Sequence, residues 1–134
     1  MVDLPYLCGL DAAVDVVGGK WKALILWELH AEPHRFGRLR RALPGISEKM
    51  LIQQLRDLEG DGIVHREVYR EVPPRVEYSL TALGSSLNAA LLPLGDWGEE
   101  HMTAIAARRG RGRSRSPAAG PAGPETRQPR PSAG

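Results

Sequence analysis

The chain has 134 residues, of which 42% are hydrophobic and 25% are charged, a balance that fits one folded domain with a small core. Its formal net charge of +2 is unevenly distributed: residues 108–134 carry seven arginines and one glutamate, whereas residues 1–107 carry 11 basic and 15 acidic side chains. The single cysteine, Cys8, excludes an intrachain disulfide and a metal site built from several cysteines.

The two ends of the chain have distinct compositions. The first ten residues, MVDLPYLCGL, lack the basic start and the apolar run of a signal peptide, and the longest apolar run elsewhere is too short to span a bilayer, so we expect a cytoplasmic protein. The last 27 residues contain no aliphatic side chain larger than alanine. They cannot bury enough apolar surface to offset their chain entropy, which predicts a folded body over residues 1–107 and a disordered tail over residues 108–134.

Two helices are predicted before residue 31. Asp11 is a candidate N-cap for a short helix that continues to Val17 and ends at two glycines. Lys20 begins a second helix, KWKALILWELH, which is apolar over a wide arc. Such an arc suits a helix buried in the middle of a small domain.

A third helix is expected after Pro33, from about Arg35 to Ala42. Its buried side would carry Phe36 and Leu39, and its exposed side would carry Arg38, Arg40 and Arg41. Pro44 and Gly45 then predict a tight turn into the next helix.

The stretch from Ser47 to Glu59 is the clearest helix in the sequence. Ser47 is its candidate N-cap, and Gly60 and Gly62 supply a helix stop. One face gathers Met50, Leu51, Leu55 and Leu58, and the opposite face gathers Glu48, Lys49, Ile52, Gln53 and Arg56. The second face is rich in groups that donate to base edges or phosphates, and Ile52 suits a thymine methyl. Helix, short turn and amphipathic helix together predict a helix-turn-helix.

After Gly62 the apolar period changes from 3.6 to 2, which predicts two antiparallel strands. Their expected half-buried positions are Val64, Val68, Val76, Tyr78 and Leu80. Pro73 and Pro74 stiffen the connection, so the segment is interpreted as the wing of a winged helix. Arg70 and Arg75 flank its tip, where cations reach phosphates or a narrow minor groove, but three nearby glutamates argue against a strongly adhesive wing.

The last predicted helix begins after Thr81, its candidate N-cap, and carries a long apolar series. Pro93 lies within the series and should kink or break the helix. Because this face exceeds what one small core needs, we interpret it as a dimerisation surface, with packing within one chain as the alternative. Its expected interface residues are Leu87, Leu91, Leu94 and Trp97. The predicted fold class is α+β, a mainly helical winged helix-turn-helix with a small antiparallel β-hairpin.

In four blocks the sequence resembles the HxlR-type winged-helix transcriptional regulators, relatives of the MarR regulators. The blocks are GGKWKALILWEL, RFGRLRRALPGISEKMLIQQLRDLEGDGIV, REVYREVPPRVEYSLTALG and LGDWGEEH. The resemblance implies a homodimer, held by its first and last helices, that binds a palindromic operator and represses or activates a nearby gene. It also implies a reading helix at Ser47 to Glu59 and a wing at Tyr69 to Val76. The sequence departs from the family pattern at Gly9, where a proline is usual, and at Ile52, where a threonine is common.

Some members of this family carry a redox-sensing cysteine just before the first helix, and Cys8 stands there. A sensor needs an exposed thiolate, yet the nearest charges, Asp3 and Asp11, are negative, so an inert thiol is the competing interpretation. Pro33 separates His30 from His34, which argues against a metal site, and no set of serine, histidine and aspartate suggests an enzyme. We expect no cofactor.

The leading hypothesis is a DNA-binding regulator with candidate contacts at Arg38, Ser47, Lys49, Ile52, Gln53, Arg56, Arg70 and Arg75. The alternative is a winged-helix protein-interaction module without DNA binding, which the net negative body favours mildly. The arginine-rich tail is either a sequence-independent phosphate-binding arm or a solvated extension.

Overall fold

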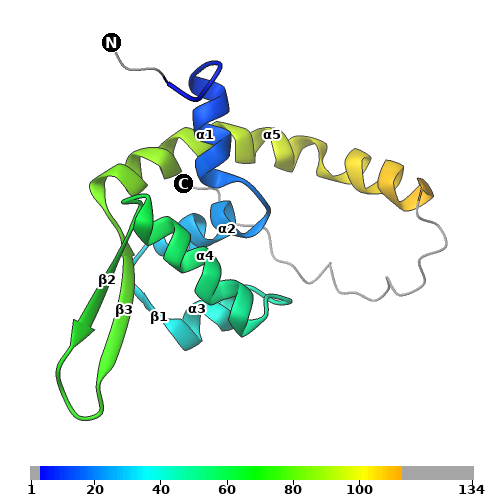
Figure 1. The fold of residues 1–134 in the computed structure, drawn as a ribbon. Coiled ribbons are helices and arrows are strands. Elements are labelled where there is room, and N and C mark those ends of the chain that lie inside the picture. The colour runs from blue at the N-terminus through cyan, green and yellow to red at the C-terminus, as the bar shows by residue number, and fades with distance from the viewer. Residues whose placement is uncertain (1–3, 113–134) are drawn as a thin grey trace. The chain divides into compact units, whose positions relative to one another are not determined.

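The computed structural model describes residues 4–112, with side chains described through residue 110. Its element order is α1, α2, β1, α3, α4, β2, β3, α5 (Figure 1). The chain divides into two compact units, residues 1–91 and residues 92–134. The first unit contains the winged helix-turn-helix, and the described part of the second is the C-terminal portion of α5.

The first two helices form close to the predicted positions. Helix α1 spans Gly9–Val17 and α2 spans Trp21–Leu29. The prediction that Asp11 is the N-cap is wrong, because the helix begins two residues earlier with Cys8 at the cap position. Asp11 lies in the first turn, and its Oδ2 accepts a hydrogen bond of 2.9 Å from the backbone amide of Leu7.

The helix-turn-helix consists of α3, Phe36–Ala42, and α4, Glu48–Gly60. The side chain of Ser47 accepts a 3.0 Å hydrogen bond from the Met50 amide, which confirms the predicted N-cap. Gly45, in the turn, has φ of +97°, and Gly62, just past α4, has φ of +76°. Both conformations favour glycine, so these residues fix where the chain reverses.

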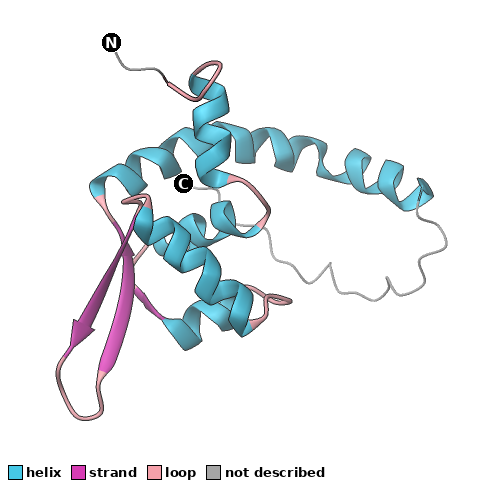
Figure 2. Cartoon of the chain, viewed as in Figure 1, coloured by secondary structure: helices cyan, strands magenta, loops and turns pink. Residues whose placement is uncertain are grey.

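A three-stranded antiparallel sheet contains the wing (Figure 2). Strands β2, Val64–Tyr69, and β3, Arg75–Leu80, form the predicted hairpin, and the sheet order is β1-β3-β2. Strand β1, His34–Arg35, was not predicted, and it pairs His34 with Tyr78. The expectation that Val68 is half-buried is wrong, because it is exposed near the free end of the hairpin.

The core of the first unit lies beneath the helix-turn-helix. Eleven apolar side chains are buried there: Ile25, Leu26, Leu29, Leu39, Leu43, Ile46, Leu51, Leu55, Leu58, Ile63 and Val64. Helix α2 supplies three of them, in agreement with its predicted central position. The sheet and the beginning of α5 add half-buried residues against this cluster, namely Tyr78, Leu80, Leu87 and Leu91.

Helix α5 spans Ala82–Gly112. The Oγ1 atom of Thr81 accepts a 3.0 Å hydrogen bond from the Gly84 amide, as expected for the predicted cap. The helix is not broken at Pro93, and it includes residues 108–112, the first five residues of the predicted tail. Residues 113–134 of the predicted disordered tail lie outside the described residues.

Candidate nucleic-acid interface

Helix α4 presents one polar face to solvent because the opposite face is fixed in the core. Leu51, Leu55 and Leu58 are buried, as the helical pattern predicted. The prediction for Met50 is wrong: it is 40% exposed, and its sulfur accepts a hydrogen bond from Gln54. One turn from the N-terminus, this side chain lies beyond the edge of the packed face.

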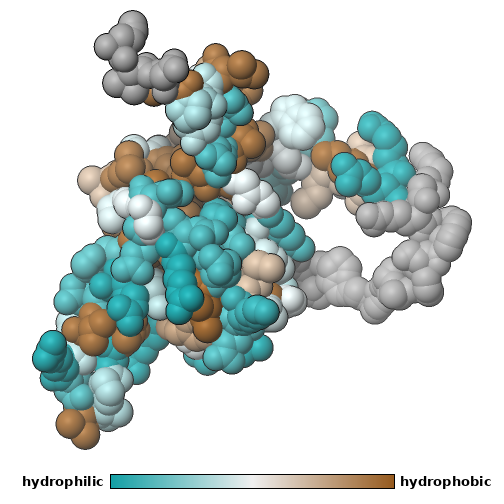
Figure 3. All heavy atoms as spheres, viewed as in Figure 1, coloured by the Kyte–Doolittle hydropathy of each residue, from teal (hydrophilic) through white to brown (hydrophobic). Residues whose placement is uncertain are grey.

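The exposed face brings together the predicted contacts Ser47, Lys49, Ile52, Gln53 and Arg56. Among the described residues, neither Lys49 nor Arg56 has an ion-pair partner, so both cations are available to an external anion. In Figure 3 the surface over α4 is mostly hydrophilic.

Gln53 is oriented by a neighbour on its own helix. Its Nε2 donates a 2.9 Å hydrogen bond to Asp57, which also forms a 3.3 Å ion pair with Lys22 of α2. The hydrogen bond from Gln53 and then that from Lys22 lower the pKa of the Asp57 carboxyl. The ionised carboxylate accepts from the Gln53 amide and favours this orientation of the side chain.

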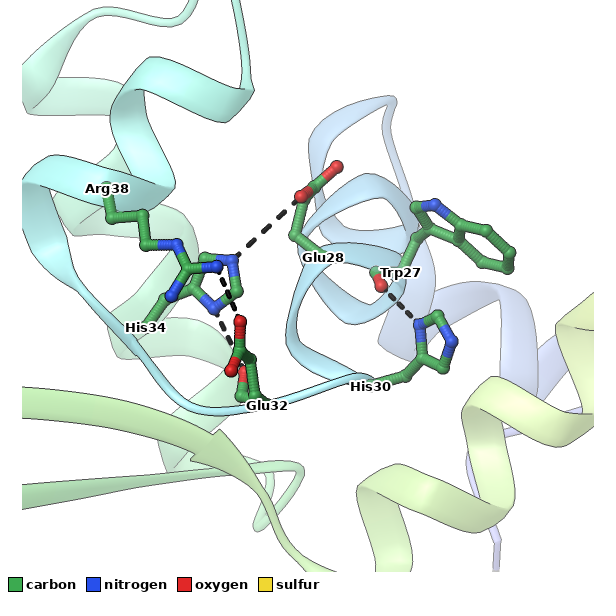
Figure 4. A network of polar contacts seen from close by, with 6 residues as sticks. All are labelled: Trp27, Glu28, His30, Glu32, His34 and Arg38. Carbon is green, nitrogen blue, oxygen red and sulfur yellow. Dashed lines mark hydrogen bonds and ion pairs between the residues drawn. The ribbon is translucent and has the colours of Figure 1, made fainter. Parts of the chain in front are cut away.

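Arg38 on α3 belongs to a polar network around the connection between α2 and α3 (Figure 4). Its guanidinium lies 2.5 Å from the carboxylate of Glu32, and this contact lowers the pKa of Glu32. The buried His34 donates from Nδ1 to the Glu32 carbonyl oxygen at 2.9 Å, while its Nε2 lies 4.0 Å from Glu28. Arg38 is thus already paired within the chain.

The two wing arginines differ in what surrounds them. Arg75 contacts Glu71 at 2.8 Å and Glu77 at 2.7 Å, and its guanidinium stacks 3.8 Å from the centre of the Tyr69 ring. The hydrogen bond to Glu71 and, to a smaller extent, that to Glu77 raise the pKa of Arg75. Arg70 has no ion-pair partner among the described residues. Of the two cations predicted at the wing tip, Arg70 is therefore the free one.

A hollow of about 300 Å³ lies between α4 and the sheet. Its lining residues are Ile52, Leu55, Arg56, Glu59, Arg66 and Tyr78. Arg66 was not among the residues singled out from the sequence. The available signal was its position two residues after Val64 on β2, because residues two apart in a strand lie on the same face.

Cys8 is exposed and has a free thiol immediately before α1. Helix α1 buries none of its own residues, and apolar side chains around it remain open to solvent. Leu7 is 95% exposed, and Leu10 and Val14 continue the same spacing of three and four residues. The segment thus carries an apolar stripe next to the thiol.

The four predicted interface residues of α5 fall into two groups. Leu87 and Leu91 are half-buried against the core of the first unit. In the second unit Leu94 and Trp97 are 63% and 54% exposed, and the Trp97 ring stacks on His101 with centroids 4.6 Å apart. Half of the predicted surface is therefore available for further packing.

The described residues offer neither a metal site nor a membrane-spanning helix. Residues 4–112 include no group of three or more histidine, cysteine, aspartate or glutamate side chains positioned to hold a metal ion. Over the same range, no helix combines the length and apolarity needed to cross a membrane.

The sequence matches one protein family over most of the folded body. The HxlR-like helix-turn-helix family matches residues 16–106. A relative from Bacillus subtilis, the uncharacterised HTH-type transcriptional regulator YdeP, is 46% identical over 98 residues, which cover 73% of this chain and 77% of YdeP. Its name places it among transcriptional regulators, which act by binding DNA and are not typically enzymes.

Solved structures agree with the sequence matches. The redox regulator HypR in its reduced form is 44% identical, with a TM-score of 0.70 over 75% of this chain and 99% of that one. The reduced form of the regulator YodB from B. subtilis is 35% identical, with a TM-score of 0.63 over 70% and 93% of the two chains. The winged helix-turn-helix and these matches together establish that the chain belongs to the HxlR-like family and is a DNA-binding transcriptional regulator of the helix-turn-helix type.

Proposed function

We propose that the protein acts as a homodimer on a palindromic operator, with the two copies of α4 in successive major grooves about 34 Å apart. The observation that carries this proposal is the exposed face of α4, whose Lys49 and Arg56 have no ion-pair partner among the described residues. Free cations at a helix surface bind phosphates or guanine edges without first breaking an internal ion pair.

The residues divide by role. Lys49, Gln53 and Arg56 contact bases or phosphates, and Ile52 contacts a thymine methyl. Ser47 and Arg70 contact the backbone, at the start of the reading helix and at the wing. Two further phosphate contacts, Arg38 and Arg75, exchange their glutamate partners for DNA when the complex forms.

Two apolar surfaces support dimerisation. Leu7, just before α1, and Leu10 and Val14 on α1 are exposed, and Leu94 and Trp97 are exposed on α5. Exposed apolar stripes of this kind are covered in stable proteins by a partner, and a two-fold dimer covers both copies at once. A dimer also explains how one short reading helix per chain achieves specificity, because two half-sites are read together.

A gel shift with the DNA upstream of the protein's own gene tests the operator proposal. Gln53→Ala and Arg56→Ala should each lose binding while the folded dimer is retained. Gln54→Ala is a matched control, because it removes the same side chain one position away, where the amide contacts Met50. Retained binding in the first two variants would refute the reading face. A wild-type dimer that binds no DNA would favour the protein-interaction module instead.

Regulation through Cys8 is the second part of the proposal. The similar protein HypR is named a redox regulator, and Cys8 is an exposed thiol beside the apolar stripe of α1. On oxidation, two Cys8 thiols from two copies lose two protons and two electrons and form one disulfide, or Cys8 pairs with a small-molecule thiol.

Operator binding of wild type and Cys8→Ser, each measured reduced and after diamide, tests this regulation. Diamide accepts the two protons and two electrons. Wild type should change its affinity on oxidation, and Cys8→Ser should not. Identical behaviour of the two proteins would leave Cys8 as an inert thiol.

A further inference from the structure

The hollow between α4 and the sheet contains two arginines from different elements. Arg56 reaches it from the reading helix and Arg66 reaches it from β2. Within the described part of the chain, neither guanidinium forms an ion pair, although Glu59 lines the same hollow. Two uncompensated cations that border one concave surface create a local positive potential.

The fold fixes the orientation of Arg66. In β2 the side chains of Val64 and Arg66 share a face, and Val64 is buried against the core. The next residue, Glu67, lies on the opposite face, where it contacts His65 at 2.8 Å. Arg66 pairs in register with Tyr78, which also lines the hollow. The strand therefore directs Arg66 towards α4, whereas Glu67 points away from it.

The geometry of duplex DNA determines what crosses this hollow. When a helix lies in the major groove and the adjoining hairpin reaches the neighbouring minor groove, one sugar-phosphate strand separates the two grooves. That strand passes between the helix and the hairpin. We propose that the hollow between α4 and β2 is a phosphate seat, in which Arg66 and Arg56 donate to one phosphodiester of that strand.

This inference rests on the proposed function, since it requires α4 to lie in the major groove. It adds a contact residue, Arg66, that belongs neither to the reading face nor to the wing tip. The seat holds the helix and the wing to the same DNA strand, and so it fixes the register of α4 without reading sequence. Glu59 opposes the phosphate and weakens the seat, because its carboxylate lines the same hollow.

The test uses the full chain and a fluorescent duplex recovered from random-sequence DNA by binding to wild type. Arg66→Gln should weaken binding by about tenfold at low salt, as expected for one charge-assisted hydrogen bond. It should also reduce the log-log salt slope by about 0.9, the value for one phosphate contact. Glu59→Gln should tighten binding by about threefold. Glu67→Gln is the matched control for Glu59→Gln and should change binding less.

A second measurement locates the phosphate. Neutral methylphosphonates are placed at one backbone position of the duplex at a time, and affinity is measured for wild type and Arg66→Gln. One position should weaken wild type by about tenfold and weaken Arg66→Gln clearly less, because only the contact from Arg56 is then left to lose. If no such position exists, or if Arg66→Gln binds like wild type, the seat is refuted and the reading helix stands. If wild type recovers no duplex, the proposed function itself is refuted, and the seat with it.

Discussion

The joint between the sheet and α5 depends on a glycine that packs directly on backbone. A Cβ atom built on Gly84 would lie 2.1 Å from the carbonyl oxygen of Ile63, whereas ordinary contact begins near 3.4 Å. Gly84→Ala must therefore separate the two backbones by about 1.3 Å. The Ile63 carbonyl also accepts a 3.1 Å hydrogen bond from the Thr81 amide, so the same movement strains that bond.

The expected cost of Gly84→Ala follows from three contributions to the free energy of unfolding. Overpacking costs about 1–3 kcal/mol. Weakening the hydrogen bond to Thr81 costs about 1 kcal/mol. The helix preference of alanine returns up to about 1 kcal/mol. We expect a net loss of about 2 kcal/mol, which corresponds to a decrease in Tm of roughly 10 °C for a domain of this size.

Urea unfolding followed by circular dichroism measures this loss, with Gly95→Ala on the same helix as the control. Apart from its chain neighbours and the backbone of its own helix, no described atom lies within 4 Å of a Cβ built on Gly95, so that substitution should stabilise the protein by about 0.5–1 kcal/mol. The two variants should shift the urea midpoint in opposite directions. If Gly84→Ala is as stable as wild type, the backbone of α5 does not pack on the Ile63 carbonyl as closely as the structure shows.

Three further predictions concern the cap, a carboxylate and the tail. Ser47→Ala should lower the free energy of unfolding by about 1 kcal/mol, measured in urea, because it removes an amide partner in the first turn of α4. Contacts with Gln53 and Lys22 lower the pKa of the Asp57 carboxyl in the folded state. The ionised carboxylate therefore stabilises the folded state above about pH 4, the ordinary range of an aspartate. This stabilisation is lost as the pH falls through the lowered pKa of the folded state. Asp57→Asn should flatten this acid loss in urea titrations between about pH 6 and pH 3, and an unchanged profile would contradict it. Deletion of the residues after Arg109 should weaken binding to all DNA similarly and flatten the salt slope, whereas an unchanged slope would exclude a phosphate-binding arm.

The helices were predictable because their boundaries depend on local chemistry. Ser47 accepts from a free amide at the start of α4, and Gly45 and Gly62 adopt backbone conformations that favour glycine. Residues next to the helix in sequence therefore determine where it begins and ends. Strand β1 was missed because two residues cannot show a period, and its pairing with β3 joins residues 44 positions apart, His34 and Tyr78. Long-range pairing of this kind has no local signal.

The candidate interface was only partly predictable. The glutamates near the wing were visible in the sequence, but the sequence did not show which arginine they pair with. In the structure Glu71 and Glu77 both contact Arg75, Glu32 contacts Arg38, and Arg70 has no ion-pair partner among the described residues. Arg66 was overlooked for a different reason. The alternation in β2 is evident only from its apolar residues, and an arginine on a strand is typical of a solvated charge. Its role depends on α4, which forms the other wall of the hollow and is not adjacent to Arg66 in sequence.

The distribution of charge along the body weakens the argument that its net charge of −4 favours a protein-interaction module. All 11 basic residues of the body lie between Lys20 and Arg75. Three acidic residues precede Gly18 and three lie between Leu91 and Arg108, so residues 18–91 have a net charge of +2. Within that segment Glu32, Asp57, Glu71 and Glu77 are paired internally, while Lys49, Arg56, Arg66 and Arg70 have no ion-pair partner among the described residues. Salt screens interactions beyond a Debye length of about 10 Å, so the charges near the DNA contribute most to the electrostatic free energy of binding. The charge of the helix and wing therefore bears on DNA binding more than the net charge of the whole body.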